Sequence, residues 1–416
     1  MTVRKYIMCP TCDCVFLLKL QVDHTIYKGW HLRFVCPDCG ELIDIRISDN
    51  LDKLKYSVDA EETISSGYIL GYNPILPNSK INYFSHFENE EQTMIALGVF
   101  MALDYSQVEI HNSEVAWINT NVSPYSDWLK SLLPMINTNN TKAFTRKLST
   151  LIGNDHNEFK EIGNPISVFD ELIYEVYQNF VSKRYLNQVS PLYRDYQDKL
   201  ISANYEVKMG FKQELAELGI VLGKWKRESA YKLISDYVNK VGDYIQSLFY
   251  FNNGSFEIPH NSQLYTTTIS IEAAMSLYAQ SFECYMKVFP FMIAITNFGT
   301  YGSFDDFGAD NPQHNSIQAF CKLSSGTQIE LICNSAHPAN SWLLSALSND
   351  IRNGKTHDSF KYDSVSQMVS IYDNNDDLKI IHKESLFDIC HRTHILVLHI
   401  IEALRMGNFY NKLTQE

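Results

Sequence analysis

The sequence predicts a mainly α-helical protein with a small β module at its N-terminus. Two observations support this prediction. Beyond about residue 86, apolar residues return every three or four positions over most of the chain, which is the period of a helix packed on one side. Within the first 50 residues, short β-like runs alternate with two pairs of closely spaced cysteines, a pattern typical of a small fold held by a metal ion. Helical domains are therefore expected to follow a metal-bound β module.

The N-terminal module, residues 1–50, contains two cysteine knuckles. They are Cys9-Pro10-Thr11-Cys12 and Cys36-Pro37-Asp38-Cys39, and Gly40 relieves the turn after the second. Two thiolates with two residues between them can turn around one ion, so the four sulfurs predict a closed tetrahedral shell for one zinc ion. Because no ligand position stays open, this zinc is expected to be structural. Cys14 is an alternative to Cys12 as a ligand.

The module resembles a zinc ribbon. Its β-like runs are Val15–Val22, Trp30–Val35 and Leu42–Ile47, which lie between and after the knuckles. Zinc ribbons bind nucleic acid or protein, or cap a neighbouring domain. The first 50 residues carry six Lys and Arg against six Asp and Glu. This neutral charge is unfavourable for a nucleic-acid partner.

Length and charge exclude several classes of protein. At 416 residues the chain is long for one domain, and two or three domains are expected. The longest apolar runs, Val288–Ile295 and Ile395–Ile401, are far shorter than the roughly 20 residues that a membrane span needs. Since the first residues also lack an apolar signal core, we expect a soluble cytoplasmic protein without a membrane partner. The formal net charge of −13 argues against broad affinity for duplex DNA, although a locally positive cleft could accept one RNA loop.

The nine cysteines are unevenly distributed, with five of them in the first 39 residues. An odd number in a chain without a signal sequence argues against a disulfide framework. The remaining four are Cys284, Cys321, Cys333 and Cys390. We expect these four to be small buried hydrophobic residues in a reducing compartment.

Residues 51–85 are predicted to form a connector, because Asn, Pro, Ser and Gly are frequent there. Residues 86–265 are predicted to form a helical middle domain. Its expected helices, placed by the apolar period, are Glu88–Leu103, Ile166–Arg184, Leu192–Ile220 and Trp225–Phe251.

The middle domain contains the only basic stretch of the chain that also carries an aromatic residue, Trp225. Its cationic residues are Lys208, Lys212, Lys224, Lys226, Arg227, Lys232 and Lys240. Such a stretch can hold an RNA backbone. The interleaved Glu214, Glu217 and Glu228 favour instead an ordinary solvated helix face.

Residues 266–416 are predicted to form the last domain. A helix is expected over about Ile269–Val288, ended by Pro290. A second helix is expected to begin near Pro338. Gly354 is predicted to end it in the left-handed conformation that glycine adopts readily after a last helical turn.

A hairpin and a long closing helix complete this domain. The hairpin strands are expected at Met368–Tyr372 and Leu378–His382, and the helix at about Glu384–Arg405. The residues that the closing helix is expected to bury are Leu386, Ile389, Thr393, Leu396, Val397, Ile400 and Leu404. His391 and His394 have a spacing that can hold a metal, but they lie off this stripe and no second ligand motif accompanies them. We expect them to face solvent or a dimer partner.

The stretch Ile351-Arg352-Asn353-Gly354-Lys355-Thr356-His357-Asp358 carries the main functional hypothesis. Arg offers a permanently charged fork of donors to phosphate oxygens, and His, with an ordinary pKa of about 6.5, can transfer a proton near neutrality. Together they could cut RNA without a metal, if one activates the ribose 2′-OH and the other stabilises charge on the phosphate. Along an unbroken helix, however, five residues rotate by about 140°, so Arg352 and His357 would face different ways. Either the helix ends at Gly354 and the chain folds His357 back, or a two-fold axis brings two copies together.

This motif, with the hairpin and the long terminal helix after it, resembles the HEPN superfamily of helical domains. That family is defined by an Arg, a polar residue, and then a His after four to six positions. The resemblance covers a little over a third of the chain. It implies a bundle of four to five helices that dimerises and forms a composite cleft, and a metal-independent endoribonuclease that often serves as the toxic effector of anti-phage or toxin–antitoxin systems. Similar sequences often have Ala where this chain has Gly354 and Thr356.

On this resemblance Arg352, Asn353 and His357 are the candidate catalytic residues, and no catalytic metal is expected. The substrate would be RNA, such as a transfer RNA or another structured RNA, and the homodimer would form through residues 266–416. The middle domain and the zinc ribbon would select the RNA or sense a trigger, such as a regulatory protein.

Three other interpretations stay open. Arg352 could simply favour the negative end of a helix dipole, with His357 as a capping or surface residue. The same cleft could belong to a non-catalytic HEPN-like module that binds a nucleotide or a protein. The chain could also be a scaffold or regulator that acts through its zinc ribbon, with the C-terminal bundle only a dimerisation unit.

Overall fold

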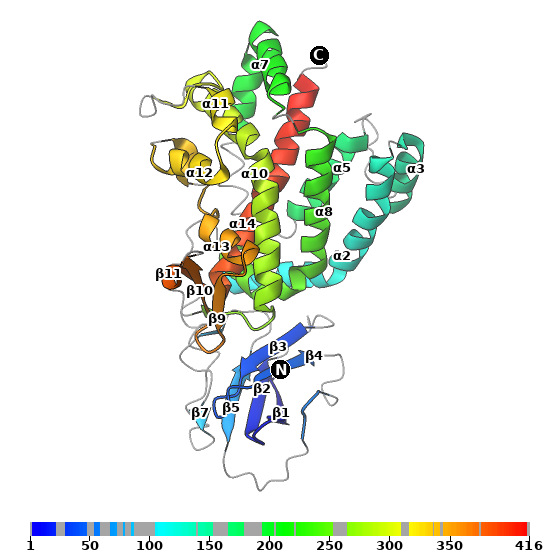
Figure 1. Ribbon diagram of the computed structural model, residues 1–416. Coiled ribbons are helices and arrows are strands. Elements are labelled where there is room, and N and C mark those ends of the chain that lie inside the picture. The colour runs from blue at the N-terminus through cyan, green and yellow to red at the C-terminus, as the bar shows by residue number, and fades with distance from the viewer. Residues whose placement is uncertain are drawn as a thin grey trace.

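The computed structural model describes residues 2–21, 30–47, 54–58, 67–72, 78–79, 85–86, 105–138, 140–152, 165–178, 194–203, 205–219, 222–252, 264–308, 316–335, 337–341, 344–373 and 376–413. Helices make up most of these segments, and the strands lie mainly in the N-terminal module and in a hairpin sheet near the C-terminus (Figure 1). The prediction of a mainly α-helical protein with a small N-terminal β module is confirmed.

The N-terminal module is built from two small sheets. Its strands are β1 (Thr2–Met8), β2 (Val15–Gln21), β3 (Trp30–Val35), β4 (Leu42–Ile47), β5 (Tyr68–Tyr72) and β7 (Ser85–His86). One sheet has the order β1-β2-β5-β7, in which β1 is antiparallel and β5 parallel to β2; the other is the antiparallel pair β3-β4. The three predicted β-like runs correspond to β2, β3 and β4, whereas β1, β5 and β7 lie outside them. Strands β5 and β7 fall within residues 51–85, the predicted connector, and join the sheet of β1 and β2.

The helical body follows. Its elements are α2 (Tyr105–Asn137), α3 (Thr141–Ile152), α5 (Pro165–Gln178), α7 (Tyr205–Glu217), α8 (Lys224–Lys240), η4 (Val241–Tyr244), α9 (Ile245–Asn252), α10 (Ile271–Tyr301), α11 (Ile317–Cys321), α12 (Ser325–Cys333), η5 (Pro338–Ser341), α13 (Asn349–Thr356) and α14 (Leu386–Leu413). Residues 194–202 are also helical, and two short strands, β6 (Asn78–Ser79) and β8 (Leu264–Tyr265), pair with each other. No helix in the described segments is both long and apolar enough to cross a bilayer.

The expected helices of the middle region are found with different bounds. Ile166–Arg184 corresponds to α5, Leu192–Ile220 divides into the 194–202 segment and α7, and Trp225–Phe251 divides into α8, η4 and α9. The expected helix at Glu88–Leu103 lies outside the described residues. A single apolar core contains buried residues from Ile118 to Tyr410, so helices on both sides of the predicted boundary at 265/266 share it. The domain boundaries themselves stay a prediction.

The N-terminal module packs against one end of this body. Its own apolar core also includes Val115 of α2 and Ile245 of α9. Arg33 on β3 ties the two parts together, because its backbone N–H donates to the Thr267 carbonyl (3.0 Å) and its guanidinium to the Thr268 carbonyl (2.7 Å). Two sheets too small to bury a large core alone are thus supported by the helices.

Helix α10 does not end before Pro290, as the sequence predicts, but continues to Tyr301. Ser270 caps its start by accepting a bond from the Ala273 N–H (3.3 Å), and Gly302 closes it with φ 80° in the left-handed region. A proline inside a helix costs one backbone hydrogen bond. Every residue from Val288 to Gly299 is buried, so packing around this turn retains the helix where local propensity would end it.

The predicted helix from Pro338 to Gly354 is also wrong: η5 and α13 are separate. Ser348 starts α13 by accepting from the Ile351 N–H (3.3 Å). Gly354 lies inside α13 and is buried, and a Cβ added there would lie 3.0 Å from Cγ2 of Ile371. The left-handed residue is Asp358 (φ 53°), and the Ser359 N–H donates back to the Gly354 carbonyl (2.9 Å), which closes the helix.

The predicted hairpin is confirmed as β10 (Met368–Asp373) and β11 (Asp376–Ser385), which are antiparallel. A third strand, β9 (Phe360–Asp363), pairs with β10 and gives the order β11-β10-β9. Val369 and Ile371 of β10 are buried. The contact of Ile371 with Gly354 joins this sheet to α13.

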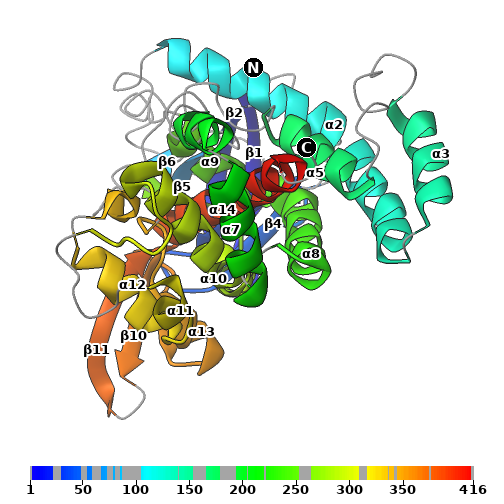
Figure 2. The ribbon, with the colours of Figure 1, turned by 90° about the horizontal axis from the view of Figure 1, so that it is seen from above.

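The predicted closing helix is found as α14, which extends to Leu413, and its expected apolar stripe is buried. The expectation that His391 and His394 face solvent or a dimer partner is wrong, because both side chains are fully buried. Helices α5, α8, α9 and α10 pack around α14 and enclose it (Figure 2). The polar face of α14 therefore meets other helices.

Two hydroxyl groups hold the buried imidazole of His394. Its Nδ1 lies 2.7 Å from the Tyr237 hydroxyl and its Nε2 lies 2.8 Å from the Ser247 hydroxyl. Ser247 donates its own proton to the Tyr244 carbonyl (2.8 Å), so Nε2–H donates to Ser247 and Nδ1 accepts from Tyr237. Burial lowers the pKa of His394 well below its usual value, which keeps the ring neutral.

The four scattered cysteines were expected to be buried, and the structure corrects this in part. Cys284 and Cys390 are buried, Cys321 is half-buried, and Cys333 is exposed at the end of α12. Cys333 occupies the last turn of a short surface helix, where apolar character alone does not secure burial.

Candidate functional site

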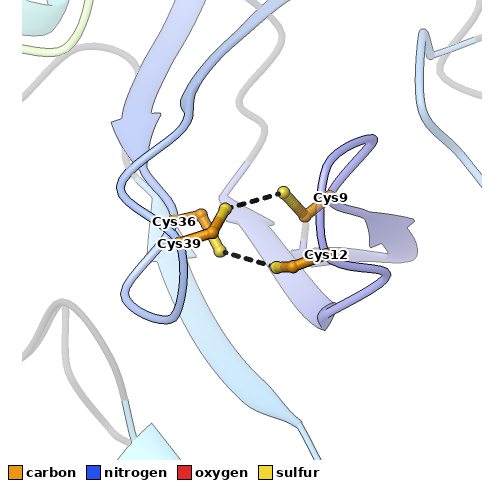
Figure 3. Close-up of side chains that lie close together, drawn as sticks. All are labelled: Cys9, Cys12, Cys36 and Cys39. Atoms are coloured by element: carbon orange, nitrogen blue, oxygen red, sulfur yellow. Dashed lines mark hydrogen bonds between the residues drawn. The ribbon is translucent and has the colours of Figure 1, made fainter.

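Four cysteine sulfurs meet in the N-terminal module (Figure 3). The Sγ atoms of Cys9, Cys12, Cys36 and Cys39 all lie within 4.8 Å of one another. The Cys9–Cys39 and Cys12–Cys36 separations are 3.6 and 3.5 Å. A tetrahedral zinc site with Zn–S bonds of about 2.3 Å needs sulfurs roughly 3.8 Å apart. The four cysteines are therefore placed to hold one tetrahedral metal ion.

The two knuckles have the same backbone geometry. In the first, the Asp13 N–H donates to the Cys9 carbonyl (3.1 Å), and in the second the Gly40 N–H donates to the Cys36 carbonyl (2.9 Å). Both residues after the second cysteine are left-handed, Asp13 with φ 59° and Gly40 with φ 78°. Asp tolerates this conformation better than most side chains, so it can stand where the other knuckle has Gly.

Cys14, the alternative ligand, lies outside the group of four. Its half-buried side chain packs against the apolar core of the module. Burial, together with a hydrogen bond to Asp38, raises the pKa of Cys14 and favours the neutral thiol. Hydrogen bonds from the backbone at Thr11 and Cys12 outweigh burial and lower the pKa of Cys9, whereas burial and hydrogen bonds to neighbouring thiols raise the pKa values of Cys12 and Cys39. The position of its sulfur, and not its pKa, therefore separates Cys14 from the group of four.

The second candidate site lies on α13, which carries Arg352 and Asn353 and is followed directly by His357. The Nε and Nη2 atoms of Arg352 each lie 2.5 Å from Oε1 of Glu283 on α10. Nη1 of Arg352 donates to the side-chain oxygen of Asn353 (2.7 Å). The guanidinium also lies 5.9 Å from the centre of the Phe282 ring. Arg352 is 29% exposed, so its charge is oriented by neighbours and still reaches solvent.

His357 caps the C-terminal end of α13. Its backbone N–H donates to the Asn353 carbonyl (2.9 Å), and its side chain is exposed. Since α13 is unbroken up to Thr356, Arg352 and His357 are turned by about 140° from each other around the helix axis. The first arrangement that the sequence allows, a helix that ends at Gly354 with His357 folded back, is therefore wrong. The arrangement in which two copies supply the two groups stays a prediction.

A charged cluster lies between α13, β11 and α14. Arg392 of α14 contacts both carboxylate oxygens of Glu384 (3.3 Å each) and donates to the Ser345 carbonyl (2.9 Å). Glu384 also contacts Nε2 of His382 (2.7 Å), whose Nδ1 lies 4.0 Å from Asp350 in the first turn of α13. Burial opposes ionisation of Glu384, but His382 and Arg392 outweigh it and lower its pKa. The cluster links α13 and β11 to the central helix α14.

Sequence reasoning missed Glu283 and this cluster. Glu283 stands 69 positions before Arg352, and no local period relates them. Glu384 and Arg392 lie on either side of a strand–helix junction, where neither the two-residue nor the 3.6-residue period applies. Only the packing of α10, α13, β11 and α14 brings these charges together.

Nothing matched this chain when it was compared with protein-family models, curated proteins and solved structures. The resemblances to a zinc ribbon and to HEPN domains therefore rest on the motifs described above and on the residues around them.

Proposed function

We propose that this protein is a metal-independent endoribonuclease of HEPN type. The observation that carries the proposal is the exposed chemistry of α13 and its C-cap: an oriented, partly exposed guanidinium and the Asn353 amide that holds it lie on the helix, and the exposed imidazole of His357 follows its last residue. A charge that can bind phosphate and a group that can transfer a proton are the two requirements for cutting RNA at the ribose 2′-OH.

In the proposed reaction two copies of α13 face each other across a two-fold axis. His357 takes the proton from the 2′-OH, the 2′ oxygen bonds to phosphorus, and the bond from phosphorus to the 5′ oxygen breaks. His357 of the second copy returns a proton to the leaving oxygen, and Arg352 stabilises the charge that develops on the phosphate. The products are a 2′,3′-cyclic phosphate and a 5′-OH.

Glu283 must give up Arg352 when a phosphate binds. Its side chain is 49% exposed, and an ion pair in such a position contributes about 0–1 kcal/mol. A phosphate oxygen carries more charge and accepts hydrogen bonds from the same donors, so replacing Glu283 by phosphate costs little free energy.

The rest of the chain supports a regulated enzyme in this proposal. The four N-terminal cysteines hold one structural zinc ion, which completes the ribbon and leaves no open position for catalysis. The ribbon and the middle region select a structured RNA or respond to a regulatory protein, as a toxic effector of an anti-phage or toxin–antitoxin system requires. The homodimer forms through residues 266–416.

The proposal is tested by incubating total RNA with zinc-loaded protein, with EDTA added just before the RNA. Wild type should cleave and leave 2′,3′-cyclic phosphate ends, whereas His357→Ala and Arg352→Ala should not. Thr356→Ala is the matched control, because Thr356 is exposed on the same turn and is not a proposed catalytic residue. Equal cleavage by wild type and His357→Ala would show that the assignment is wrong.

Two observations favour a second candidate function, a non-catalytic binding module. The Glu283 carboxylate already pairs with Arg352, and an acidic chain gives RNA little general attraction. This alternative predicts that wild type binds a nucleotide or a protein partner under conditions in which RNA is not cleaved.

A further inference from the structure

Trp225 in the first turn of α8 exposes an indole ring to solvent. Its side chain is 63% exposed, which is unusual for the largest apolar side chain. The ammonium of Lys287 on α10 lies 4.6 Å from the centre of this ring. An exposed aromatic surface beside a cation is the combination that proteins use to bind single-stranded nucleic acid.

Trp225 and Arg352 contact two residues of one strip of α10. Lys287, which contacts Trp225, and Glu283, which contacts Arg352, are four residues apart and so stand one turn above the other on the same face, with roughly 6 Å of rise between them. Figure 1 shows α10 between α13 and α8, and both helices pack against it. The flanking residues Phe282, Cys284 and Val288 are buried, so this face is a narrow solvent-facing strip.

We propose that Trp225 and Lys287 form a subsite for single-stranded RNA next to Arg352. A base stacks on the exposed indole, Lys287 contacts the phosphate beside it, and the strand continues along α10 towards Arg352. This inference rests on the proposed function in one respect: the strand that binds the subsite is taken to be the RNA that the enzyme cleaves.

The chemistry of the strip favours an unpaired strand over a duplex. A base must leave its helix to stack on a side chain, whereas a duplex offers mainly its phosphates. With a net charge of −13 the protein has little general attraction for phosphates, so stacking must supply part of the affinity. Glu283, between the two cations, limits binding to a strand that can displace it from Arg352.

The test measures binding of the full-length protein to a fluorescein-labelled 2′-O-methyl RNA strand by anisotropy. The methyl groups block 2′-OH attack, so binding is observed without cleavage. Trp225→Ala should weaken binding at least about fivefold, and Trp225→Phe, which keeps an aromatic face, should retain most of it. Lys287→Gln should lower the salt dependence by about one phosphate contact. Lys361→Gln is the matched control, because Lys361 on β9 lies 5.0 Å over the Tyr372 ring and has no role in the proposed subsite, so it should leave binding unchanged.

Three outcomes would overturn the subsite: unchanged affinity in Trp225→Ala with native circular dichroism, no binding of the strand by wild type, or equal affinity for the strand and its duplex. Should Trp225→Ala fail to fold, wild-type salt dependence in Lys287→Gln is the overturning result. Trp225-dependent binding without cleavage of unmodified RNA would leave the subsite standing and remove the proposed activity. Cleavage of unmodified RNA by Trp225→Ala with an unchanged KM would support the proposed activity and overturn the subsite.

Discussion

Oε1 of Glu283 accepts from two nitrogens of Arg352, Nε and Nη2, at 2.5 Å each. The pair joins α10 to α13 at the surface, and Oε1 occupies the two donors, Nε and Nη2, that a phosphate would use on the same guanidinium. Glu283 therefore holds Arg352 in position and also competes with the ligand that Arg352 is proposed to bind.

Glu283→Gln should strengthen binding of the 2′-O-methyl strand a few-fold, since the amide competes less well with phosphate for Arg352. Thermal stability should change little, because a partly exposed ion pair contributes about 0–1 kcal/mol. Anisotropy titrations and melting curves measure the two effects. Weaker binding in this variant would mean that Glu283 acts by orienting Arg352 and does not compete.

Gly354→Ala should destabilise the protein. A Cβ at this position meets Cγ2 of Ile371 at 3.0 Å and Cγ1 at 3.2 Å inside a packed contact. Overpacking of this kind costs about 1–3 kcal/mol, of which the better helix propensity of Ala returns at most about 1 kcal/mol. Chemical denaturation measures the change.

Gly210→Ala on α7 is the control for this variant. A Cβ there has no neighbour within 4 Å, so the variant should gain up to about 1 kcal/mol from helix propensity alone. A gain of the same size in Gly354→Ala would contradict the close contact with Ile371.

Local signals in the sequence were sufficient for several elements. Cysteine spacing predicted the four sulfurs that meet in the N-terminal module, and the two periods predicted the β10–β11 hairpin and the apolar stripe of α14. Each depends on residues close together in the chain. Because most helices and strands can be predicted from such local patterns, the fold class can be predicted from them as well.

Tertiary packing decided the features that the sequence did not predict. Pro290 stays helical because its turn is buried, and Gly354 lies inside α13 at a place where an added Cβ would meet Ile371 at 3.0 Å. His394 is polar and yet buried, since hydroxyl groups from α8 and α9 satisfy it. Glu283 reaches Arg352 only after α10 and α13 have packed. No pattern among residues close together in the sequence predicts any of these contacts.

Cys36→Ser should remove the metal, and Cys14→Ser should not. Elemental analysis of the purified chain should find about one zinc per protein in wild type and Cys14→Ser, because Cys14 lies outside the group of four. The helical circular dichroism signal should largely survive in Cys36→Ser, since the module and the helical body have separate apolar cores. Full zinc content in Cys36→Ser would contradict the four-sulfur site.

Glu402 of α14 should make stability depend on pH. Its carboxylate is fully buried, with Oε2 3.4 Å from Arg405 and no hydrogen-bond partner for Oε1 among the described residues. Burial raises the pKa of Glu402 from 4.5 to about 7; Arg405 opposes this shift and Glu171 adds to it.

The sign follows from proton binding. Between pH 4.5 and 7 the folded state keeps a proton that the unfolded state has lost, so raising the pH through this window lowers the free energy of unfolding. The loss is complete above pH 7 and amounts to at most about 3 kcal/mol. Glu402→Gln keeps the shape and cannot ionise, so it should lack this component. Urea unfolding of both proteins across the window gives the difference directly. The difference should grow as the pH rises and then level off, whereas parallel curves would show that Glu402 does not titrate in the folded protein.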